Sequence, residues 1–434
     1  MTGASNEVGA PGGFSGDMDE IRATVGRLLD VIAACDGYGY DTYDTRIGPL
    51  YLWLYKSRER NLLADYVLRG LYALEFAAPI FYRRIRGIQP AWDPMGNSYR
   101  AGAHLALSLV EKGPAHLAAA RDILDRVAAK AVGEPGRRGF ALGFPCITGS
   151  DKMWRTDVPV SHYTLRVARK FLQWERMVHD GRYCGILDEA IRFLAEGLPW
   201  VERDGLLGVA YTPDDQLQVL NIWADVASLL ACHGKERGTD AHRGKSLRLA
   251  RGVLAHQAKD GSWPYFARWE RPFGRVDNSH TAMVLGALAD VALCYPGDIK
   301  AEVLPALERG AVRWMEMFFD EATGRCWNMA DRPAQSYTAC LGDALYAILR
   351  ITRSDLGLSP DLAARLTRLA GRTAVWSLRN LKLPDGRFCE RRIGGRRFAV
   401  QSVRSFDGLV ADALALYWAA HGVSGSERCL LWNI

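Results

Sequence analysis

The sequence lacks any apolar run long enough to cross a membrane. A transmembrane helix needs about 20 consecutive apolar residues, and no stretch of the 434 residues reaches that length. Residues 1–16 are rich in Gly, Ser and Ala and have neither the basic start nor the apolar middle of a secretory signal. We therefore expect residues 1–16 to form a disordered tail, followed by one folded domain over residues 17–434.

Paired cysteines are lacking too. The nine Cys residues are an odd number and include no CxxC pair, which argues against a disulfide framework and against a zinc ribbon. Cys232, Cys294 and Cys340 lie within apolar helical patterns, where buried free thiols are expected. This usage predicts a cytoplasmic location. The sequence also has no HExxH or paired-histidine spacing, so we expect neither a metal site nor another cofactor.

Motifs for phosphate binding and for serine nucleophiles are also missing, because no GxxxxGK[ST], no GxGxxG after a strand and no GxSxG is present.

The net charge of +6 is modest for this length, and no basic stripe belongs to a known nucleic-acid-binding module. We therefore expect no nucleic-acid partner. One basic patch stands out, formed by Arg391, Arg392, Arg396, Arg397 and Arg404. It suits an anionic small molecule or glycan, and a solvated surface explains it as well.

What the sequence does contain is a repeat of apolar helix, Gly-containing aromatic loop and apolar helix. Seven such units are present, and their second helices begin near residues 46, 98, 159, 216, 279, 336 and 405. A period of about 50 to 70 residues is typical of a solenoid or closed ring of antiparallel helical hairpins. No linker interrupts the period, so the predicted fold class is all-α, a single (α/α)6–7 toroid.

The second helices are the more uniformly apolar ones, for example over residues 281–288. A helix that is apolar all round is buried, so we expect the second helices to form an inner ring and the amphipathic first helices an outer ring. Every loop that precedes a second helix then lies at the same end of the ring, which we call the rim. A funnel at the rim is the predicted binding site.

Three motifs carry a family resemblance. They are GYDTYD at residues 39–44, DGSW at residues 260–263 and DNSH at residues 277–280. On a toroid they resemble a family encoded beside bacterial exopolysaccharide, capsule and lipopolysaccharide genes, whose usual GYDPYD differs here at Thr42.

The resemblance covers roughly residues 30–420 and implies the six-hairpin glycosidase-like group. That group includes inverting glycosidases, unsaturated-uronide hydrolases, polysaccharide lyases and uronate epimerases, so the resemblance implies a carbohydrate context rather than one reaction. The DGSW turn also resembles the repeat of triterpene cyclases, but Asp214–Asp215 is too short to be their DxDD motif.

Glycoside hydrolysis needs a protonated acid near the leaving oxygen and a second carboxylate, about 6.5–9.5 Å away in inverting enzymes. The rim loops supply the candidates Asp41, Asp44, Asp93, Asp157, Asp214, Asp215, Asp277 and Glu390. The preferred catalytic pair is Asp277 with Asp44 or Asp214. Structural roles stay open, because Asp277 and Asp214 precede helices that they could cap, and Asp41 and Asp44 are spaced for Asx turns.

Histidine and tyrosine side chains offer a second chemistry. His162 and His280 fall in the first turns of two predicted inner helices, where each is either a general base or a hydrogen-bonded structural group. Lyase or epimerase chemistry needs a base beside a uronate carboxyl and a cation that neutralises this carboxyl. The candidates for that set are Tyr43, Tyr211, Tyr265 or Tyr337 with Arg391 or Arg404.

Several tryptophans lie in the loops rather than on the helical apolar stripes, namely Trp92, Trp154, Trp263, Trp269 and Trp327. Flat rings of this kind stack on the apolar faces of sugars. Trp92 and Trp327 are the preferred ligand contacts, whereas Trp263 is better explained by packing beneath its Asp-Gly turn. Asn278, directly after Asp277, completes the set of predicted contacts.

These features together predict a carbohydrate-active enzyme, foremost a glycoside hydrolase, acting on an oligo- or polysaccharide. The substrate implied by the resemblance is a bacterial surface polysaccharide or its lipid-linked precursor. A uronate lyase, a C5-epimerase and a non-catalytic glycan-binding protein of the biosynthetic complex are the alternatives, and a terpenoid cyclase is a more distant one. The sequence determines neither the sugar and its linkage nor the oligomeric state.

Overall fold

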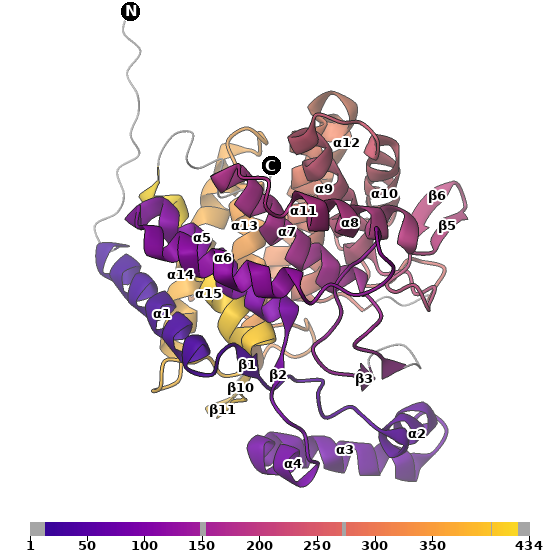
Figure 1. Ribbon diagram of the computed structural model, residues 1–434, viewed down its shortest axis with the longest axis vertical. Coiled ribbons are helices and arrows are strands. Elements are labelled where there is room, and N and C mark those ends of the chain that lie inside the picture. The colour runs from indigo at the N-terminus through magenta and orange to yellow at the C-terminus, as the bar shows by residue number, and fades with distance from the viewer. Residues whose placement is uncertain (1–13, 148–152, 271–274, 401, 424–434) are drawn as a thin grey trace, which may run out of the picture.

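The computed structural model describes residues 14–147, 153–270, 275–400 and 402–423. Within this part of the chain, six helices form an inner ring: α5 (Pro94–Glu111), α7 (Ser161–Val178), α9 (Leu220–Arg237), α11 (Asn278–Cys294), α13 (Thr338–Ile351) and α15 (Gly408–Gly422). Each inner helix packs on the next, and α15 returns to α5, which closes the ring (Figure 1). The predicted all-α toroid is confirmed.

An outer layer of helices surrounds this ring. It consists of α1 (Phe14–Ala34), α6 (Pro114–Ala128), α8 (Cys184–Arg192) with the π-helical turn η1 (Phe193–Gly197), α10 (Arg243–Ala255), α12 (Pro296–Phe318) and α14 (Pro360–Asn380). The inner helices α11 and α15 are buried on nearly every side, whereas α14 buries one face and exposes the other. The prediction that the second helices form the inner ring is therefore confirmed for these six helices, although α7 among them carries several charged residues.

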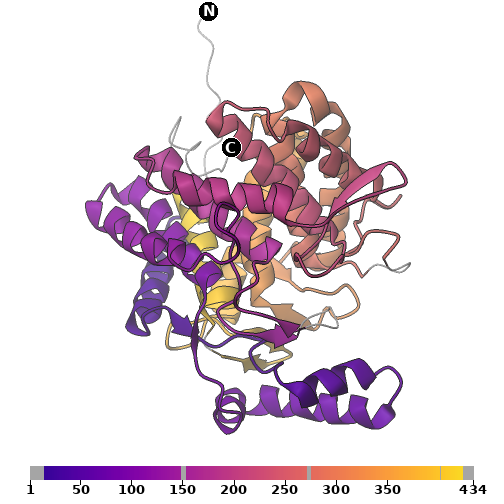
Figure 2. The same ribbon diagram turned by 45° about the vertical axis from the view of Figure 1, so that its right-hand side comes forward.

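One of the seven predicted units is not a hairpin of the ring. The helix expected near residue 46 is α2 (Pro49–Ser57), which with α3 (Leu62–Ala77) and α4 (Pro79–Ile85) forms an insertion between α1 and α5. This insertion lies at the lower end of the molecule in Figures 1 and 2. Its helices cannot serve as inner helices because each buries only one narrow stripe: α2 buries Tyr51 and Leu54, and α3 buries Ala64 and Leu68.

Local sequence signals begin many of these helices. A proline stands in the first turn of six of them, namely α2, α4, α5, α6, α12 and α14, where its missing N–H costs no hydrogen bond. Asp93 caps α5 by accepting a hydrogen bond from the Gly96 N–H at 2.8 Å. Asp277 caps α11 in the same way, through the His280 N–H at 3.0 Å.

Short antiparallel strands connect the helices at the rim. The two-stranded pairs are β1 (Tyr38–Gly39) with β2 (Ala91–Trp92), β3 (Cys146–Ile147) with β4 (Met153–Trp154), β5 (Trp200–Arg203) with β6 (Leu206–Val209), and β7 (Phe319–Asp320) with β8 (Arg325–Cys326). A three-stranded sheet has the order β11-β10-β9 and consists of β9 (Gln335–Tyr337), β10 (Arg391–Ile393) and β11 (Arg396–Phe398). The π-helical turn η2 (Val403–Asp407) then leads into α15.

The start of α1 and the lengths of the helices bear on two predictions. Helix α1 begins at Phe14, so the last three residues of the predicted tail are helical, and residues 1–13 lie outside the described part of the chain. None of the helices in the described ranges combines the length and the apolarity that a bilayer crossing requires.

Candidate functional site

The loops that precede the inner helices gather at one end of the ring, and the insertion α2–α4 lies against this end (Figures 1 and 2). The inner helices begin at this end, so their N-termini, which carry partial positive charge, are directed toward it. The rim therefore receives groups from loops that are far apart in the sequence.

Asp41, in the first motif, is locked to Arg404. Arg404 donates through Nε and Nη2 to the two oxygens of Asp41 at 2.6 and 2.5 Å, a bidentate pair. The Tyr43 N–H also donates to Asp41 Oδ1 at 2.9 Å, so the carboxylate ties its own loop. Both side chains of the ion pair are buried. Arg404 thus lies inside the protein and is not part of the basic surface patch that the sequence suggested.

Asp44 is buried and bonded to an arginine of the insertion. Arg83 Nε donates to Asp44 Oδ2 at 3.1 Å, and the Asp41 N–H donates to the same oxygen at 2.8 Å. Burial raises the pKa of Asp44 to about 6, although Arg83 acts in the opposite direction. Asp44 is therefore protonated more readily than an ordinary aspartate, as the acid of a glycosidase must be.

Asp277 forms a carboxylate–imidazole pair with His280. The two side chains meet at 2.7 Å between Asp277 Oδ1 and His280 Nδ1. Burial by itself raises the pKa of Asp277, but the imidazole and the backbone N–H of His280 outweigh it, so the pKa lies below its ordinary range. An ionised carboxylate accepts hydrogen bonds only, which puts a proton on Nδ1. The helix cap and the pair with histidine are thus made by one carboxylate.

The other ring nitrogen of His280 is available for chemistry. The His280 side chain is 29% exposed, whereas that of Asp277 is 1% exposed. Among the described residues, His280 Nε2 has no hydrogen-bond partner, and it is not one of the buried unpaired atoms. A buried carboxylate that orients an exposed imidazole is an arrangement suited to a general base.

Four half-buried tyrosines lie in this part of the rim. Tyr265 lies directly beside the Asp277–His280 pair, with 4.3 Å between the ring centroids of Tyr265 and His280. Tyr43 interacts electrostatically with Tyr211, Tyr265 and Tyr337, which places the four hydroxyls in one neighbourhood. Burial raises the pKa of Tyr211, Tyr265 and Tyr337, so these hydroxyls stay protonated and can donate hydrogen bonds. The structure therefore brings together the tyrosines that the sequence singled out.

His162 belongs to the same group. It stands in the first turn of α7, and its Nδ1 has no hydrogen-bond partner within the described residues. Burial, followed by the charge of Arg166, holds the pKa of His162 well below its ordinary range. The ring is therefore neutral at neutral pH. His162 interacts electrostatically with both His280 and Arg404, which places it near the two ion pairs.

Three other predicted carboxylates lie in different settings. Asp93 is buried beneath the rim as the cap of α5, and burial raises its pKa to about 6. Asp157 is exposed and pairs with Arg155, which donates to it through Nε at 2.8 Å. Asp214 is exposed and also interacts with Arg155. Asp157 and Asp214 thus share one surface arginine, and a catalytic role for Asp214 stays a prediction.

Most of the loop tryptophans pack against protein. Trp92 is 8% exposed and lies under the Arg126 guanidinium, 4.7 Å from the ring centroid. Trp263 is buried and donates to the Val253 carbonyl at 3.0 Å, in agreement with its expected packing role. Trp327 donates to the Met317 carbonyl at 2.9 Å. These contacts give the three rings structural roles, and contact of Trp92 or Trp327 with a ligand stays a prediction.

Two further residues from the predicted set, Asn278 and Trp154, lie near the rim and are held by contacts with the protein. Asn278 is fully buried and joins the loop after β8 to α12, donating to the Trp327 carbonyl at 3.0 Å and accepting from Trp314 Nε1 at 2.8 Å. Trp154 is partly exposed and stacks on Tyr211 with 5.0 Å between ring centroids. Of the loop tryptophans, Trp154 therefore lies beside the tyrosine group.

Glu390 and Arg391 pair with one another beside the insertion. The Arg391 guanidinium lies 4.3 Å from the Phe76 ring centroid, on α3, and 5.5 Å from that of Tyr337. Glu390 interacts electrostatically with Tyr337. Both residues thus stand where the insertion meets the rim.

Below the rim, the ring encloses an ionic network that sequence reasoning missed. Its members are Arg166, Arg169 and Lys170 on α7, Asp225 on α9, Asp290 on α11, Asp343 and Arg350 on α13, and Asp412 on α15. Lys170 Nζ lies 2.5 Å from Asp412 Oδ2, and Arg169 lies 3.4 Å from both Asp225 and Asp290. The missed signal was the spacing of Arg166, Arg169 and Lys170, which are three and four residues apart and so lie on one face of α7.

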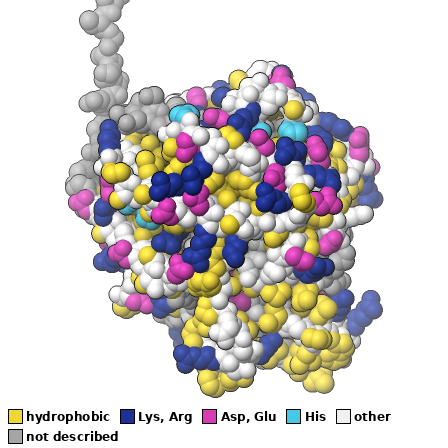
Figure 3. All heavy atoms as spheres, in the orientation of Figure 1, with side chains coloured by type: hydrophobic (Ala, Val, Ile, Leu, Met, Phe, Trp, Pro, Cys, Tyr) yellow, Lys and Arg dark blue, Asp and Glu magenta, His cyan; other side chains and the backbone are white. Residues whose placement is uncertain are grey.

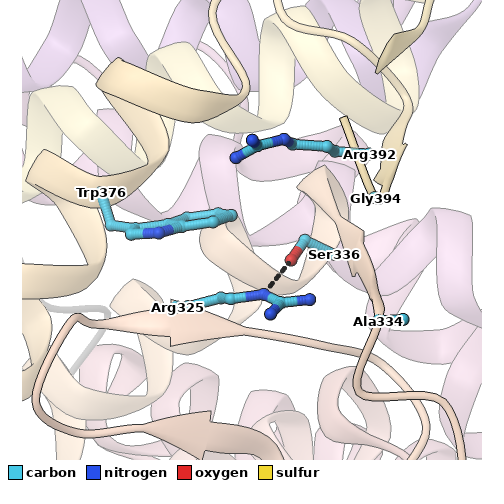
Figure 4. A pocket seen from close by; sticks show the side chains of 6 residues that line it. All are labelled: Arg325, Ala334, Ser336, Trp376, Arg392 and Gly394. Carbon is cyan, nitrogen blue, oxygen red and sulfur yellow. Dashed lines mark hydrogen bonds between the residues drawn. The ribbon is translucent and has the colours of Figure 1, made fainter. Parts of the chain in front are cut away.

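One cavity of about 340 Å³ lies outside this site, lined by Arg325, Ala334, Ser336, Trp376, Arg392 and Gly394 (Figure 4). Ser336 pairs with Arg392 across β9 and β10, and the next pair is Tyr337 with Arg391. Successive side chains of a strand point to opposite faces. The cavity is therefore on the face of the sheet turned away from the rim tyrosines.

Comparison with known proteins gives a fold but no family. No protein-family model matches the sequence, and no curated protein matches it. Solved structures do share its architecture. The cellobiose 2-epimerase from Spirochaeta thermophila has a TM-score of 0.60 at 13% identity, over 95% of this chain and 98% of that chain.

Two further structures match in the same way. A protein from Salmonella enterica serovar Paratyphi A, described as a possible member of glycoside hydrolase family 105, has a TM-score of 0.59 at 11% identity, over 96% of this chain and 98% of that chain. A family 88 glycosyl hydrolase from Bacteroides vulgatus has a TM-score of 0.53 at 12% identity, over 82% of this chain and 99% of that chain. At these identities the likeness shows the shared toroid fold alone.

Proposed function

We propose that this protein is a carbohydrate-active enzyme in which the His280–Asp277 pair transfers a proton at the rim. The observation that carries the proposal is the 2.7 Å hydrogen bond between Asp277 and His280 Nδ1, with the ring 29% exposed. The carboxylates of Asp41, Asp44, Asp93 and Asp277 are buried, whereas His280 and the four tyrosines are partly exposed. Proton abstraction by imidazole therefore suits the rim better than direct attack by a carboxylate.

The chemistry that follows is abstraction of a proton from the carbon beside a sugar carboxyl or carbonyl group. His280 Nε2 takes the proton, and the tyrosine hydroxyls near Tyr43 donate hydrogen bonds to the oxygen on which charge develops. Delivery of a proton from water to the opposite face of that carbon gives an epimer. Departure of the oxygen substituent at the next carbon, which takes up the proton held by His280, gives an unsaturated sugar and a free hydroxyl group. Shared folds with a cellobiose 2-epimerase and with glycoside hydrolases support a carbohydrate substrate.

Hydrolysis is the second candidate, and one observation favours it. Burial raises the pKa of Asp44 to about 6, while His280 holds the pKa of Asp277 below its ordinary range. Two carboxyls with pKa values moved apart are the usual mark of an acid and a base in glycosidases. In this reaction Asp44 protonates the leaving oxygen, and Asp277 or His280 activates a water.

The substrate we propose is a bacterial surface polysaccharide or its lipid-linked precursor. This finer assignment is supported by the resemblance of the motifs at residues 39–44, 260–263 and 277–280 to a family encoded beside polysaccharide genes. A cytoplasmic site of action, inferred from cysteine usage, belongs to the same proposal.

The test is a panel of acidic and neutral bacterial polysaccharides incubated with the purified protein in deuterated water. Deuterium at the carbon beside the carboxyl identifies an epimerase, ultraviolet absorbance of an unsaturated uronide identifies a lyase, and new reducing ends without either identify a hydrolase. We expect His280→Asn to lower the rate by about 10²–10⁴-fold. His421→Asn is the matched control, because His421 lies in the last turn of α15, at the end away from the rim.

Full turnover by His280→Asn would exclude the proposed base. Tight binding of a glycan with no turnover by the wild-type protein would favour a non-catalytic glycan-binding protein instead. Thermal unfolding of each variant separates these outcomes from loss of the fold.

A further inference from the structure

The insertion α2–α4 exposes an unusual number of large apolar side chains. Of the thirteen large hydrophobic residues that are exposed in the described chain, ten lie on these three helices. We call them the apolar surface: Leu50, Trp53, Leu62, Leu63, Tyr66, Val67, Leu74, Ile80, Phe81 and Ile85, each 37–71% exposed. They form much of the lower part of the molecule in Figure 3. Scattered single residues need no explanation, but a concentration of this kind marks an interaction surface.

The apolar surface follows helical periodicity. On α3 the exposed residues Leu62, Leu63, Tyr66, Val67 and Leu74 recur at spacings of three and four, and so lie on one face. The opposite stripe, Ala64 and Leu68, packs with Tyr51, Leu54 and Ile147 in a small core of its own. The insertion is thus folded on its inner side and unpartnered on its outer side.

Charge around the apolar surface has one predominant sign. The exposed basic residues of the insertion are Lys56, Arg60, Arg69 and Arg84, and its exposed acidic residue is Glu59. Asp65 is partly buried and pairs with Arg69 at 2.8 Å. Short amphipathic helices with Trp, Phe and Leu on one side and flanking Lys and Arg are typical of segments that lie in the surface of an anionic bilayer.

We propose that the apolar surface of α2–α4 docks this protein on an anionic lipid bilayer. The side chains of Trp53, Phe81 and Ile85 enter the boundary between headgroups and acyl chains, and the flanking arginine and lysine side chains meet lipid phosphates. None of the three helices is long enough to span the membrane, since they contain 9, 16 and 7 residues. The insertion therefore lies on the bilayer and does not cross it.

Docking would also hold the rim near the bilayer. Arg83 on α4 is buried and bonds to Asp44 and to the Asp41 carbonyl, so the insertion is fixed to the first rim motif. Tyr55 on α2 interacts electrostatically with Tyr265, whose ring centroid lies 4.3 Å from that of His280. This second consequence rests on the proposed function, because it would present the rim to a lipid-linked saccharide. The docking itself does not depend on that function.

The test is sedimentation with vesicles of phosphatidylcholine alone or with phosphatidylglycerol. We expect binding to the anionic vesicles, weakened by salt. The triple variant Trp53→Ser/Phe81→Ser/Ile85→Ser should lose binding, and Lys56→Glu/Arg84→Glu should weaken it at least about tenfold. The matched control is Tyr38→Ser/Met153→Ser, which changes two exposed apolar residues outside the insertion and should bind normally. Circular dichroism and thermal unfolding check the fold of each variant.

Absence of vesicle binding, or equal binding by the triple variant, overturns the proposal. Light scattering tests the competing occupant, a second copy of the chain: a dimer that the triple variant converts to a monomer, without vesicle binding, would assign the surface to self-association. Because these readouts do not involve turnover, their failure is distinguishable from failure of the proposed function.

An independent observation concerns the cavity lined by Arg325, Trp376 and Arg392. In Figure 4 the Trp376 indole lies between the side chains of the two arginines. Arg325 donates to Ser336 Oγ at 3.2 Å and to the Pro333 carbonyl, and Arg392 donates to the side-chain oxygen of Asn380. All of these partners are neutral, and no described carboxylate forms an ion pair with either guanidinium.

We infer that this cavity is an accessory site for an acidic sugar residue. The guanidiniums suit a carboxylate, and the indole suits the apolar face of a pyranose. Arg397 pairs with Arg392 across β10 and β11, which adds a third arginine to this face of the sheet. The choice of a sugar as ligand rests on the proposed function, but the site is separated from the rim by the sheet.

Calorimetric titration with an oligoglucuronate, compared with a glucose oligomer of the same length, tests this site. We expect the oligoglucuronate alone to bind, and Arg392→Gln and Trp376→Ala each to weaken it about tenfold or more. Arg396→Gln is the matched control, because Arg396 pairs with Ile393 and so lies on the other face of the hairpin. Equal binding of both oligomers, or unchanged binding in Arg392→Gln, overturns the inference. Binding retained by His280→Asn would separate this site from the reaction at the rim.

Discussion

At the scale of single residues, the rim shows one carboxylate serving two purposes. Asp277 accepts a hydrogen bond from the backbone N–H of His280, and this bond caps α11. It also accepts the Nδ1–H of the same residue, and this second bond orients the imidazole. The sequence left capping and catalysis as alternatives for Asp277, and the geometry allows both at once.

The two roles of Asp277 can be separated by substitution. Asn caps a helix about as well as Asp but carries no charge. We expect Asp277→Asn to keep the unfolding temperature and to lower the rate of the rim reaction by about 10²–10⁴-fold. Asp277→Ala should lose the same activity and, in addition, about 1 kcal/mol of the free energy of unfolding. Full activity of the Asn variant would remove Asp277 from the mechanism.

A second prediction at this scale concerns a buried acid just before α15. Asp407 accepts a hydrogen bond from the Phe388 N–H at 3.0 Å, and burial raises its pKa from 3.8 to about 7. The pKa of Asp407 is thus higher in the folded than in the unfolded state. The stability that the protonated carboxyl contributes is therefore fully present below pH 4 and is lost as the pH rises through about 7.

Asp407→Asn keeps the hydrogen-bond acceptor and removes the buried charge. We therefore expect this variant to be more stable than the wild type at pH 8, by at most about 4 kcal/mol, and similar to it at pH 4. Denaturant unfolding at the two pH values measures the difference. A gain of the same size at both values would contradict the titration of Asp407.

At the scale of elements, the start of α5 is pressed against the turn η2. A Cβ on Gly96 would stand 2.7 Å from the Arg404 backbone nitrogen, so only glycine permits this approach. The same close contact positions Arg404 for its pair with Asp41. The packing of the start of α5 against η2 thus helps to set the position of the Arg404–Asp41 ion pair.

We expect Gly96→Ala to lower the free energy of unfolding by about 1–3 kcal/mol, because the added methyl group forces the two backbones apart. The matched control is Gly70→Ala in α3, where an added Cβ meets no atom within 4 Å. Alanine in an exposed helix interior should stabilise by about 0.5–1 kcal/mol. Chemical denaturation compares the two, and equal effects would show that Gly96 is not a packing requirement.

At the scale of the whole molecule, the ring is closed around buried charge. Lys170 on α7 and Asp412 on α15 meet at 2.5 Å, which joins two residues that are 242 positions apart in the chain. Removing one partner of such a pair leaves an isolated buried charge, which is more damaging than removing both.

The prediction is a double-mutant cycle. Lys170→Met alone and Asp412→Leu alone should each destabilise the protein by about 3–5 kcal/mol, whereas the double variant should lose less than the sum. Equilibrium unfolding in urea provides the three values. Simple additivity would mean that the two charges do not stabilise one another.

Neither the burial of Arg404 nor its partner could be predicted from the sequence. Its neighbours in the chain suggested an exposed basic patch, but it lies buried against Asp41, 363 residues earlier. Arg83 was not singled out, although it holds Asp44 and the insertion together. No local pattern carries this information, because an ion pair between distant segments depends on which loops the ring brings together.

The sequence by itself determined the helices, their repeat along the chain, and hence the toroid and its rim, because periodicity and turn residues act locally. Only the tertiary structure decided that the unit near residue 46 becomes an insertion beside the ring, with an apolar surface of its own. It also decided that Asp44 and Asp277 are buried while His280 and the tyrosines stay partly exposed. Exposure and charge pairing depend on contacts between distant segments, and these exist only once the ring has closed.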